Sequence, residues 1–155
     1  MLNEYDKTNE AKEIYKLLVN SDPSSMTGFN ARVNQAHTAM WESKGSFDLA
    51  INLYTQALEL QPDNLEVSLY LSKALFRNKD FDKSRELLCK KLHMHPNDLR
   101  IKFNLASVLY RSAQETFNLQ ENHRSVAVTK KAIEDLTAAK ALFLQLLQLH
   151  SEFNG

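Results

Sequence analysis

The sequence predicts an all-α protein, a solenoid of antiparallel helix pairs in which the last pair is lengthened. The first observation behind this prediction is the spacing of the three prolines, Pro23, Pro62 and Pro96, which lie 39 and 34 residues apart. Such an interval is typical of stacked helix–turn–helix units, because proline ends a helix. The second observation is the scarcity of glycine, three in 155 residues, which leaves few positions for the tight turns of β-hairpins.

Equivalent residues recur before each proline, at offsets of 12, 8 and 5 positions. They are Ala11, Tyr15 and Leu18, then Ala50, Tyr54 and Ala57, then Ser84, Leu88 and Lys91. The pattern resembles the tetratricopeptide repeat family, whose helix pairs stack because no pair closes a core alone. The predicted units cover residues 1–23, 24–62, 63–96 and 97–155. We expect this segment to belong to a longer array.

Seven helices are expected from the apolar periodicity and from residues suited to helix ends. They cover about residues 8–20, 26–44, 47–61, 65–78, 81–93, 99–119 and 125–150. Ser24 or Ser25, Asn64 and Asp98 are the expected N-caps. A polar break is expected at residues 120–124, between the two lengthened helices.

Inward faces are expected where apolar residues recur at helical spacing. Ile14 in the first helix, and Met40 and Trp41 in the second, fall on such faces. Ser72 and Ser84 are small residues at positions where two helices should approach closely.

The last helix is unusually apolar. From Ala138 to His150, nine of thirteen residues are apolar. A helix that is apolar around most of its circumference is normally buried on more than one side. We therefore expect either further repeats or a partner protein to cover this end.

The composition predicts a soluble protein of a reducing compartment. A formal net charge of zero gives no overall electrostatic attraction to nucleic acid or membrane surfaces. No apolar run reaches the length of a membrane span, and the first residues do not form a signal peptide. The one cysteine, Cys89, cannot form an internal disulfide and is expected to be structural rather than reactive.

No pattern in the sequence indicates catalysis, a cofactor or a metal. His93 and His95 are two residues apart, so on a helix they point away from each other, whereas metal-binding pairs are usually four apart. The sequence contains no glycine-rich phosphate loop and no nucleophile–base arrangement. We expect a protein that is not an enzyme.

A binding groove is expected along the inner layer of the superhelix, which is formed by the first helix of each pair. The predicted groove-facing residues are Glu66, Leu69, Lys73, Phe76 and Arg77, followed by Arg100, Phe103, Ser107, Tyr110 and Arg111. Basic and aromatic side chains alternate there, which suits an extended segment with acidic and apolar side chains. The alternative is that some of these residues pack between repeats and that the others are solvated charges.

Four stretches resemble one tetratricopeptide family in particular, the scaffold subunit, called Ctr-nine, of the RNA polymerase II-associated factor (PAF) complex. They are FDLAINLYTQALE (47–59), EVSLYLSKALF (66–76), PNDLRIKFNLASVLYRSA (96–113) and AIEDLTAAKALFLQLL (132–147). The resemblance implies a nuclear, non-catalytic scaffold. Its implied partners are the other PAF subunits and, indirectly, RNA polymerase II, in a complex that supports elongation and histone modification by other enzymes.

Two other interpretations remain open. A co-chaperone that grips an acidic C-terminus needs Lys and Asn one turn apart in the inner helices, where this chain has Leu69 with Lys73 and Phe103 with Ser107. The repeat arm of a larger enzyme, such as a glycosyltransferase, would carry a ladder of asparagines on the inner face. Here Asn104 stands alone.

Overall fold

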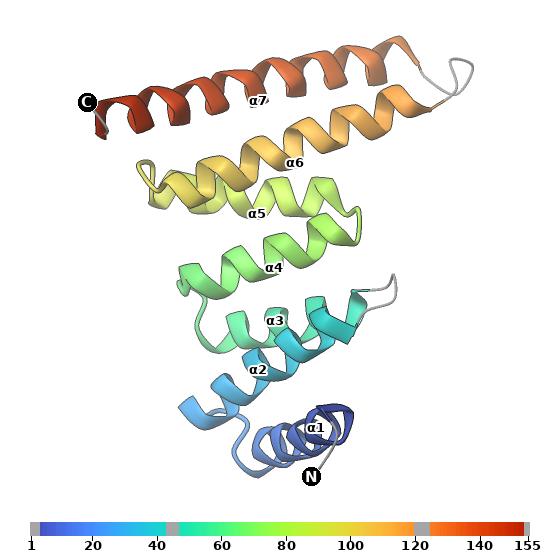
Figure 1. Cartoon of the computed structure of the whole chain (residues 1–155), viewed down its shortest axis with the longest axis vertical. Coiled ribbons are helices and arrows are strands. Elements are labelled where there is room, and N and C mark those ends of the chain that lie inside the picture. The colour runs from blue at the N-terminus through green and yellow to red at the C-terminus, as the bar shows by residue number, and fades with distance from the viewer. Residues whose placement is uncertain (1–3, 43–46, 120–124, 154–155) are drawn as a thin grey trace. The chain divides into compact units, whose positions relative to one another are not determined.

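A computed structural model of the chain describes residues 4–42, 47–119 and 125–153 (Figure 1). These ranges contain seven α-helices and no strand, which confirms the predicted all-α fold of successive helix pairs. The expected end of the second helix, at Lys44, and the expected polar break at 120–124 lie outside the described residues. Within the described part, none of the helices has the length and apolar character that crossing a membrane requires.

The chain divides into two compact units, Met1–Asn78 and Lys79–Gly155. The division falls inside the stretch 63–96, for which the sequence predicts one repeat. The repeat boundaries therefore stay a prediction.

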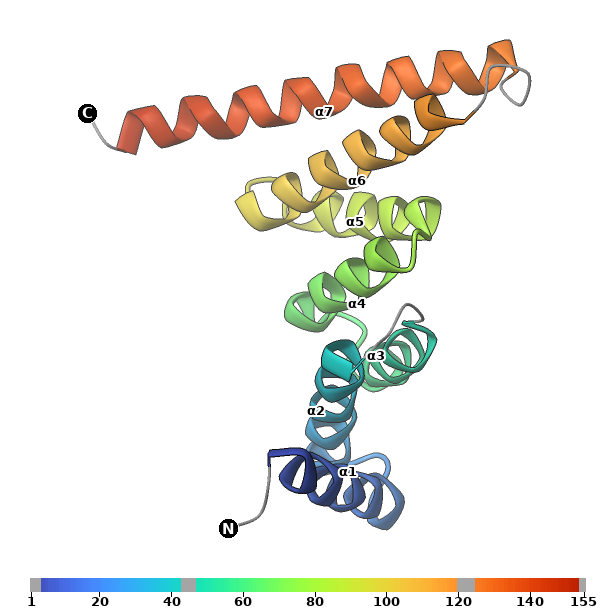
Figure 2. The same ribbon diagram turned by 45° about the vertical axis from the view of Figure 1, so that its right-hand side comes forward.

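The first unit contains α1 (Glu4–Ser21), α2 (Met26–Glu42), α3 (Asp48–Leu60) and α4 (Leu65–Arg77). Each helix packs against the next one along the chain (Figure 2). The chain reverses its direction from each helix to the next, as Figure 1 shows. The predicted starts of α2 and α4 are confirmed, whereas α1 begins about one turn earlier than the apolar stripe suggests.

The turn between α1 and α2 is held by close backbone packing. The Ser25 hydroxyl accepts a hydrogen bond from the Gly28 amide at 3.0 Å, as expected of an N-cap. A side chain at Gly28 would collide with the carbonyl oxygen of Asp22. The buried Arg32 donates to the Pro23 carbonyl at 2.6 Å and to the Gln56 side chain at 3.3 Å, so it joins this turn to α3.

The buried positions of α4 follow the predicted pattern of small and large residues. Ser72 is 1% exposed, and Leu71 and Leu75 are buried beside it. Asn64 caps the helix by accepting a hydrogen bond from the Val67 amide at 3.0 Å, as predicted.

Two expected inward residues face solvent instead. Ile14 is 50% exposed and Trp41 is 90% exposed. Both lie on helices whose apolar stripe is wider than the surface that their neighbours cover, so the outermost residues of the stripe stay accessible.

The second unit contains α5 (Phe81–Met94), α6 (Leu99–Asn118) and α7 (Val126–Phe153). The predicted cap Asp98 is confirmed, because its carboxylate accepts from the amides of Arg100 at 2.9 Å and Ile101 at 3.3 Å. The last pair is lengthened as predicted: α6 and α7 have 20 and 28 residues, against 14 in α5.

Small and charged residues shape the contact surface of α7. Ala132, Asp135 and Ala139 form its buried stripe, and the small alanines allow close packing. Asp135 pairs with Arg85 of α5 at 3.2 Å. Leu144 and Leu147 are 54% and 66% exposed, so this end of the described chain has an uncovered apolar surface, and its covering by a further repeat or a partner stays a prediction.

Candidate functional site

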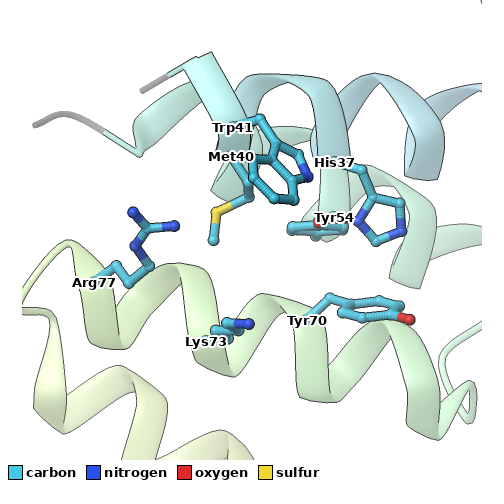
Figure 3. Close-up of a pocket in the computed structure, with 7 residues that line it drawn as sticks. All are labelled: His37, Met40, Trp41, Tyr54, Tyr70, Lys73 and Arg77. Atoms are coloured by element: carbon cyan, nitrogen blue, oxygen red, sulfur yellow. Dashed lines mark hydrogen bonds between the residues drawn. The ribbon is translucent and has the colours of Figure 1, made fainter. Parts of the chain in front are cut away.

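A cleft in the first unit lies between α2 and α4, with α3 behind it, and has a volume of about 230 Å³. Its walls combine aromatic rings, one methionine and two cations. They are His37, Met40 and Trp41 from α2, Tyr54 from α3, and Tyr70, Lys73 and Arg77 from α4 (Figure 3). In Figure 3, Met40 lies between Trp41 and Arg77, while His37 and the two tyrosines close the other end.

The closed end of the cleft is a cluster of three rings. The Tyr54 hydroxyl and Nδ1 of His37 are 2.8 Å apart and share a hydrogen bond. The His37 ring stands edge-on to Tyr70 with centroids 4.5 Å apart, and Tyr54 stacks on Tyr70 at 6.0 Å. Such ring pairs are mutually favourable and hold the surface rigid.

Burial keeps this ring cluster uncharged at neutral pH. It lowers the pKa of His37 below 6.5, so the imidazole is neutral at pH 7. Burial, and secondarily the neighbouring Tyr70, raises the pKa of Tyr54 far above its ordinary value. The pKa of Tyr70 is also raised, first by burial and then by its hydrogen bond with the Glu66 carboxylate. The charge of the cleft therefore comes from its two cations.

The two cations lie one turn apart on α4. Lys73 is exposed and forms no ion pair or hydrogen bond with any residue that the structure describes. The Arg77 guanidinium lies over the Phe47 ring, 4.6 Å from its centroid, a cation–π contact. Within the described part of the chain, Arg77 forms no ion pair with a carboxylate. Neighbouring like charges repel, so an acidic ligand would relieve an unfavourable interaction.

The predicted groove residues of the first unit occupy three environments. Lys73 and Arg77 line the cleft, whereas Phe76 is half-buried and is not part of the lining. Leu69 is 8% exposed and lines no part of the cleft. The face of α4 that lines the cleft includes Tyr70 and not Leu69, because the side chains of successive residues on a helix point about 100° apart.

The predicted groove residues of the second unit all lie on α6. Phe103 and Tyr110 are 55% and 49% exposed, and Ser107 donates its hydroxyl hydrogen bond to the Phe103 carbonyl at 2.9 Å. Arg100 pairs with the Asp98 carboxylate at 2.9 Å. Arg111 donates to the Gln114 side chain at 2.6 Å. Binding by either set of residues stays a prediction.

The sequence does not predict the part of the cleft that α2 and α3 supply, namely His37, Met40, Trp41 and Tyr54. Apolar side chains at helical spacing usually belong to the core, so the sequence predicts inward positions for Met40 and Trp41. Tyr54 is buried, at 1% exposed, and also lines the cleft. The interval from Pro23 to Pro62 is longer than the interval from Pro62 to Pro96, so the sequence does not show which α2 positions correspond to Tyr70 and Lys73 of α4. The signal that could find them is an alignment of the repeats that allows a gap for the longer of the two proline intervals, 39 against 34 residues.

The described residues offer little for metal chemistry. Within them, no three His, Cys, Asp or Glu side chains converge so that they could hold a metal ion. His93 and His95 lie at the end of α5 and are exposed, and Cys89 is a free, exposed thiol.

Comparison with known families connects part of the chain to the predicted repeat. Residues 43–90 match the tetratricopeptide repeat family. This stretch runs from just before α3 into α5, and includes the Lys73–Arg77 wall of the cleft. No curated protein matches the chain. The fold is thus an all-α helical repeat of the tetratricopeptide type, and such repeats mediate protein–protein interaction.

Proposed function

We propose that the chain is a non-catalytic interaction scaffold and that its α2–α4 cleft binds an acidic segment of a partner protein. The α2–α4 cleft is the space of about 230 Å³ that the seven residues from His37 to Arg77 line. The observation that carries this proposal is the pair of cations Lys73 and Arg77 beside an exposed tryptophan; neither cation has an ion pair with any carboxylate among the described residues. The net charge of the chain is zero, so this local charge is a feature of the cleft rather than of the whole surface.

The shape and chemistry of the cleft suggest what the segment looks like. Trp41 is 90% exposed, and aromatic residues of this kind commonly anchor protein interfaces. Met40 can adapt to apolar side chains of different shape. Lys73 and Arg77 would pair with carboxylates that flank those apolar side chains. A short acidic segment that carries one or two apolar residues fits all three features.

The cellular setting that we propose is transcription elongation in the nucleus. Support comes from the resemblance of residues 47–59, 66–76, 96–113 and 132–147 to the tetratricopeptide scaffold subunit of the PAF complex. These stretches coincide with parts of α3, α4, α6 and α7. The proposed partners are the other PAF subunits and, through them, RNA polymerase II.

A pull-down from nuclear extract tests both parts of the proposal. The bait is the whole chain, compared with the double variant Lys73→Glu and Arg77→Glu. We expect the wild-type chain to retain PAF subunits, identified by mass spectrometry, and the charge-reversed variant to lose most of them. Circular dichroism should show equal helicity, because both side chains lie at the surface.

A matched control separates the cleft from general charge. Lys83→Glu with Lys130→Glu makes the same change in net charge at exposed positions of α5 and α7. This control should retain the partners. Equal capture by all three baits would reject the cleft as the binding site. Chaperones in place of PAF subunits would favour the co-chaperone interpretation and reject the transcription role.

A further inference from the structure

The second unit carries a different surface, an apolar groove along α7. It has a volume of about 570 Å³, with Tyr110 of α6 on one side. The α7 residues Leu136, Phe143, Leu144 and Leu147 form its walls, and the small, buried Ala139 lies at its base. Lys140 is the one charged side chain in the lining.

The groove is apolar and yet open to solvent. Leu144 and Leu147 are more than half exposed, and Tyr110 is 49% exposed. The Phe103 ring of α6 meets the Phe143 ring edge-on at 6.1 Å and extends the same apolar surface. Exposed, contiguous apolar surfaces of this kind mark interaction sites.

The geometry points to a docking site for one amphipathic helix of a partner protein, with an apolar stripe and an acidic residue beside that stripe. The groove follows α7 from Leu136 to Leu147, which is roughly 16 Å or three helical turns. This length matches the i, i+3 or i+4, i+7 anchors of a helix that binds in a groove.

The chemistry of the lining favours a helix over an extended segment. Backbone amides and carbonyls that are buried without partners are costly. Apart from the Lys140 ammonium and the Tyr110 hydroxyl, the side chains that line the groove cannot form hydrogen bonds. A helix satisfies its own backbone, so it can enter such a groove without that cost.

Lys140 determines the charge of the occupant. In the part of the chain that the structure describes, its ammonium has no hydrogen bond or ion pair, and the residues three and four positions away on α7 are Leu136, Thr137, Phe143 and Leu144. A docked helix would bury part of this charge, which is costly unless a carboxylate pairs with it. An acidic residue next to the apolar stripe would supply that pair.

The same charge disfavours a second copy of this chain as the occupant. A symmetric dimer places the same patch on both sides of the interface. Two Lys140 ammonium groups would then enter one apolar interface with no lining carboxylate for either. This surface is separate from the α2–α4 cleft, so it stands or falls independently of the proposed function.

Two designed peptides test the inference. Each is a fluorescein-labelled helix of about four turns with leucines on one face; one carries glutamates beside the leucines and the other carries lysines. Fluorescence anisotropy should show the glutamate peptide binding the whole chain roughly tenfold more tightly than the lysine peptide. The preference should reverse in Lys140→Glu, and a central proline in the glutamate peptide should abolish binding, because it breaks the helix.

Further variants keep the test decisive. Leu147→Glu lies at an exposed position, so it should abolish binding while circular dichroism stays unchanged. Lys130→Glu, exposed on the same helix but outside the lining, should leave the peptide preference as it is. Equal affinity for the two peptides, or an unchanged preference in Lys140→Glu, would overturn the inference. So would a dimer in light scattering that Leu147→Glu converts to a monomer.

Discussion

Single residues decide where helices can approach each other. Gly28 lies at the first turn of α2, against the carbonyl of Asp22, and no larger residue has room there. Ser72 and Ser84 are almost completely buried, and they serve as small contact points in α4 and α5. The sequence predicts the two serines from their position in the repeat. It gives no sign of the glycine's role, because the close approach depends on the path of the preceding turn.

Gly28→Ala should destabilise the first unit by about 1–3 kcal/mol, because the added methyl group would push α2 away from the Asp22–Pro23 backbone. Urea unfolding followed by circular dichroism measures the loss. Ala39→Gly, a substitution in the same helix at a half-buried position, is a useful reference. It should cost about 1 kcal/mol or less from helix propensity. A change at Gly28 no larger than this reference would contradict the packing argument.

His37 makes the stability of the first unit depend on pH. Its pKa in the folded chain lies below the ordinary value of 6.5 because the ring is buried against Tyr54 and Tyr70. Below pH 6.5 the unfolded chain therefore binds more protons than the folded chain. The contribution of His37 is fully present above pH 6.5 and is lost as the pH falls through that value toward the folded pKa.

Urea unfolding at pH 7.5 and 5.5 tests this expectation. The wild-type chain should lose more stability on acidification than His37→Gln, which can keep a hydrogen bond to Tyr54 but does not titrate. Both proteins keep Lys73, whose charge lies in the same cleft, so a difference between them comes from the side chain at position 37. An identical pH dependence in both proteins would show that His37 is not responsible.

At the scale of elements, the helices follow from local sequence and their partners do not. The caps Ser25, Asn64 and Asp98 appear where predicted, because a cap depends only on a few neighbouring residues. Ion pairs between helices do not follow from the local sequence. Arg85 of α5 pairs with Asp135 of α7 across 50 positions of sequence, and local patterns do not reveal such a pair.

Asp135→Ala should destabilise the second unit by about 1–3 kcal/mol, because it leaves the Arg85 guanidinium without its more buried carboxylate. Thermal unfolding by calorimetry measures the effect. Asp82→Ala is the matched control, since Asp82 contacts Arg85 at 2.9 Å and Lys131 at 3.1 Å but its side chain is 76% exposed. The control should lose no more than about 1 kcal/mol. Equal losses would contradict the importance of burial.

At the scale of the whole molecule, charge is balanced overall and concentrated locally. The formal net charge is zero, so long-range attraction of a partner by the whole chain is weak. Any electrostatic contribution to the proposed binding therefore comes from local groups such as Lys73 and Arg77 in the α2–α4 cleft. Because these side chains are solvent-accessible, salt should screen their interactions.

An acidic peptide with alternating glutamate and phenylalanine provides the measurement. Its affinity for the chain should fall severalfold as the ionic strength rises from about 0.05 to about 0.3 M, since the Debye length shortens over this range. The double variant Lys73→Glu and Arg77→Glu should bind weakly and lose this salt dependence. A salt dependence that persists in the double variant would place the electrostatic contact elsewhere.

The sequence by itself determined the all-α class, the helix positions, the capping residues and the lengthened last pair. The helix ends and caps depend on interactions within a few turns of one helix, and the class follows from the proline spacing and the scarcity of glycine. Only the tertiary structure decided that Leu69 is buried and that Trp41 is exposed, and it alone brought His37 and Tyr54 to Lys73 and Arg77 in one cleft. The physical reason is that the neighbours of a helix determine which part of its surface is covered, and those neighbours come from distant parts of the chain.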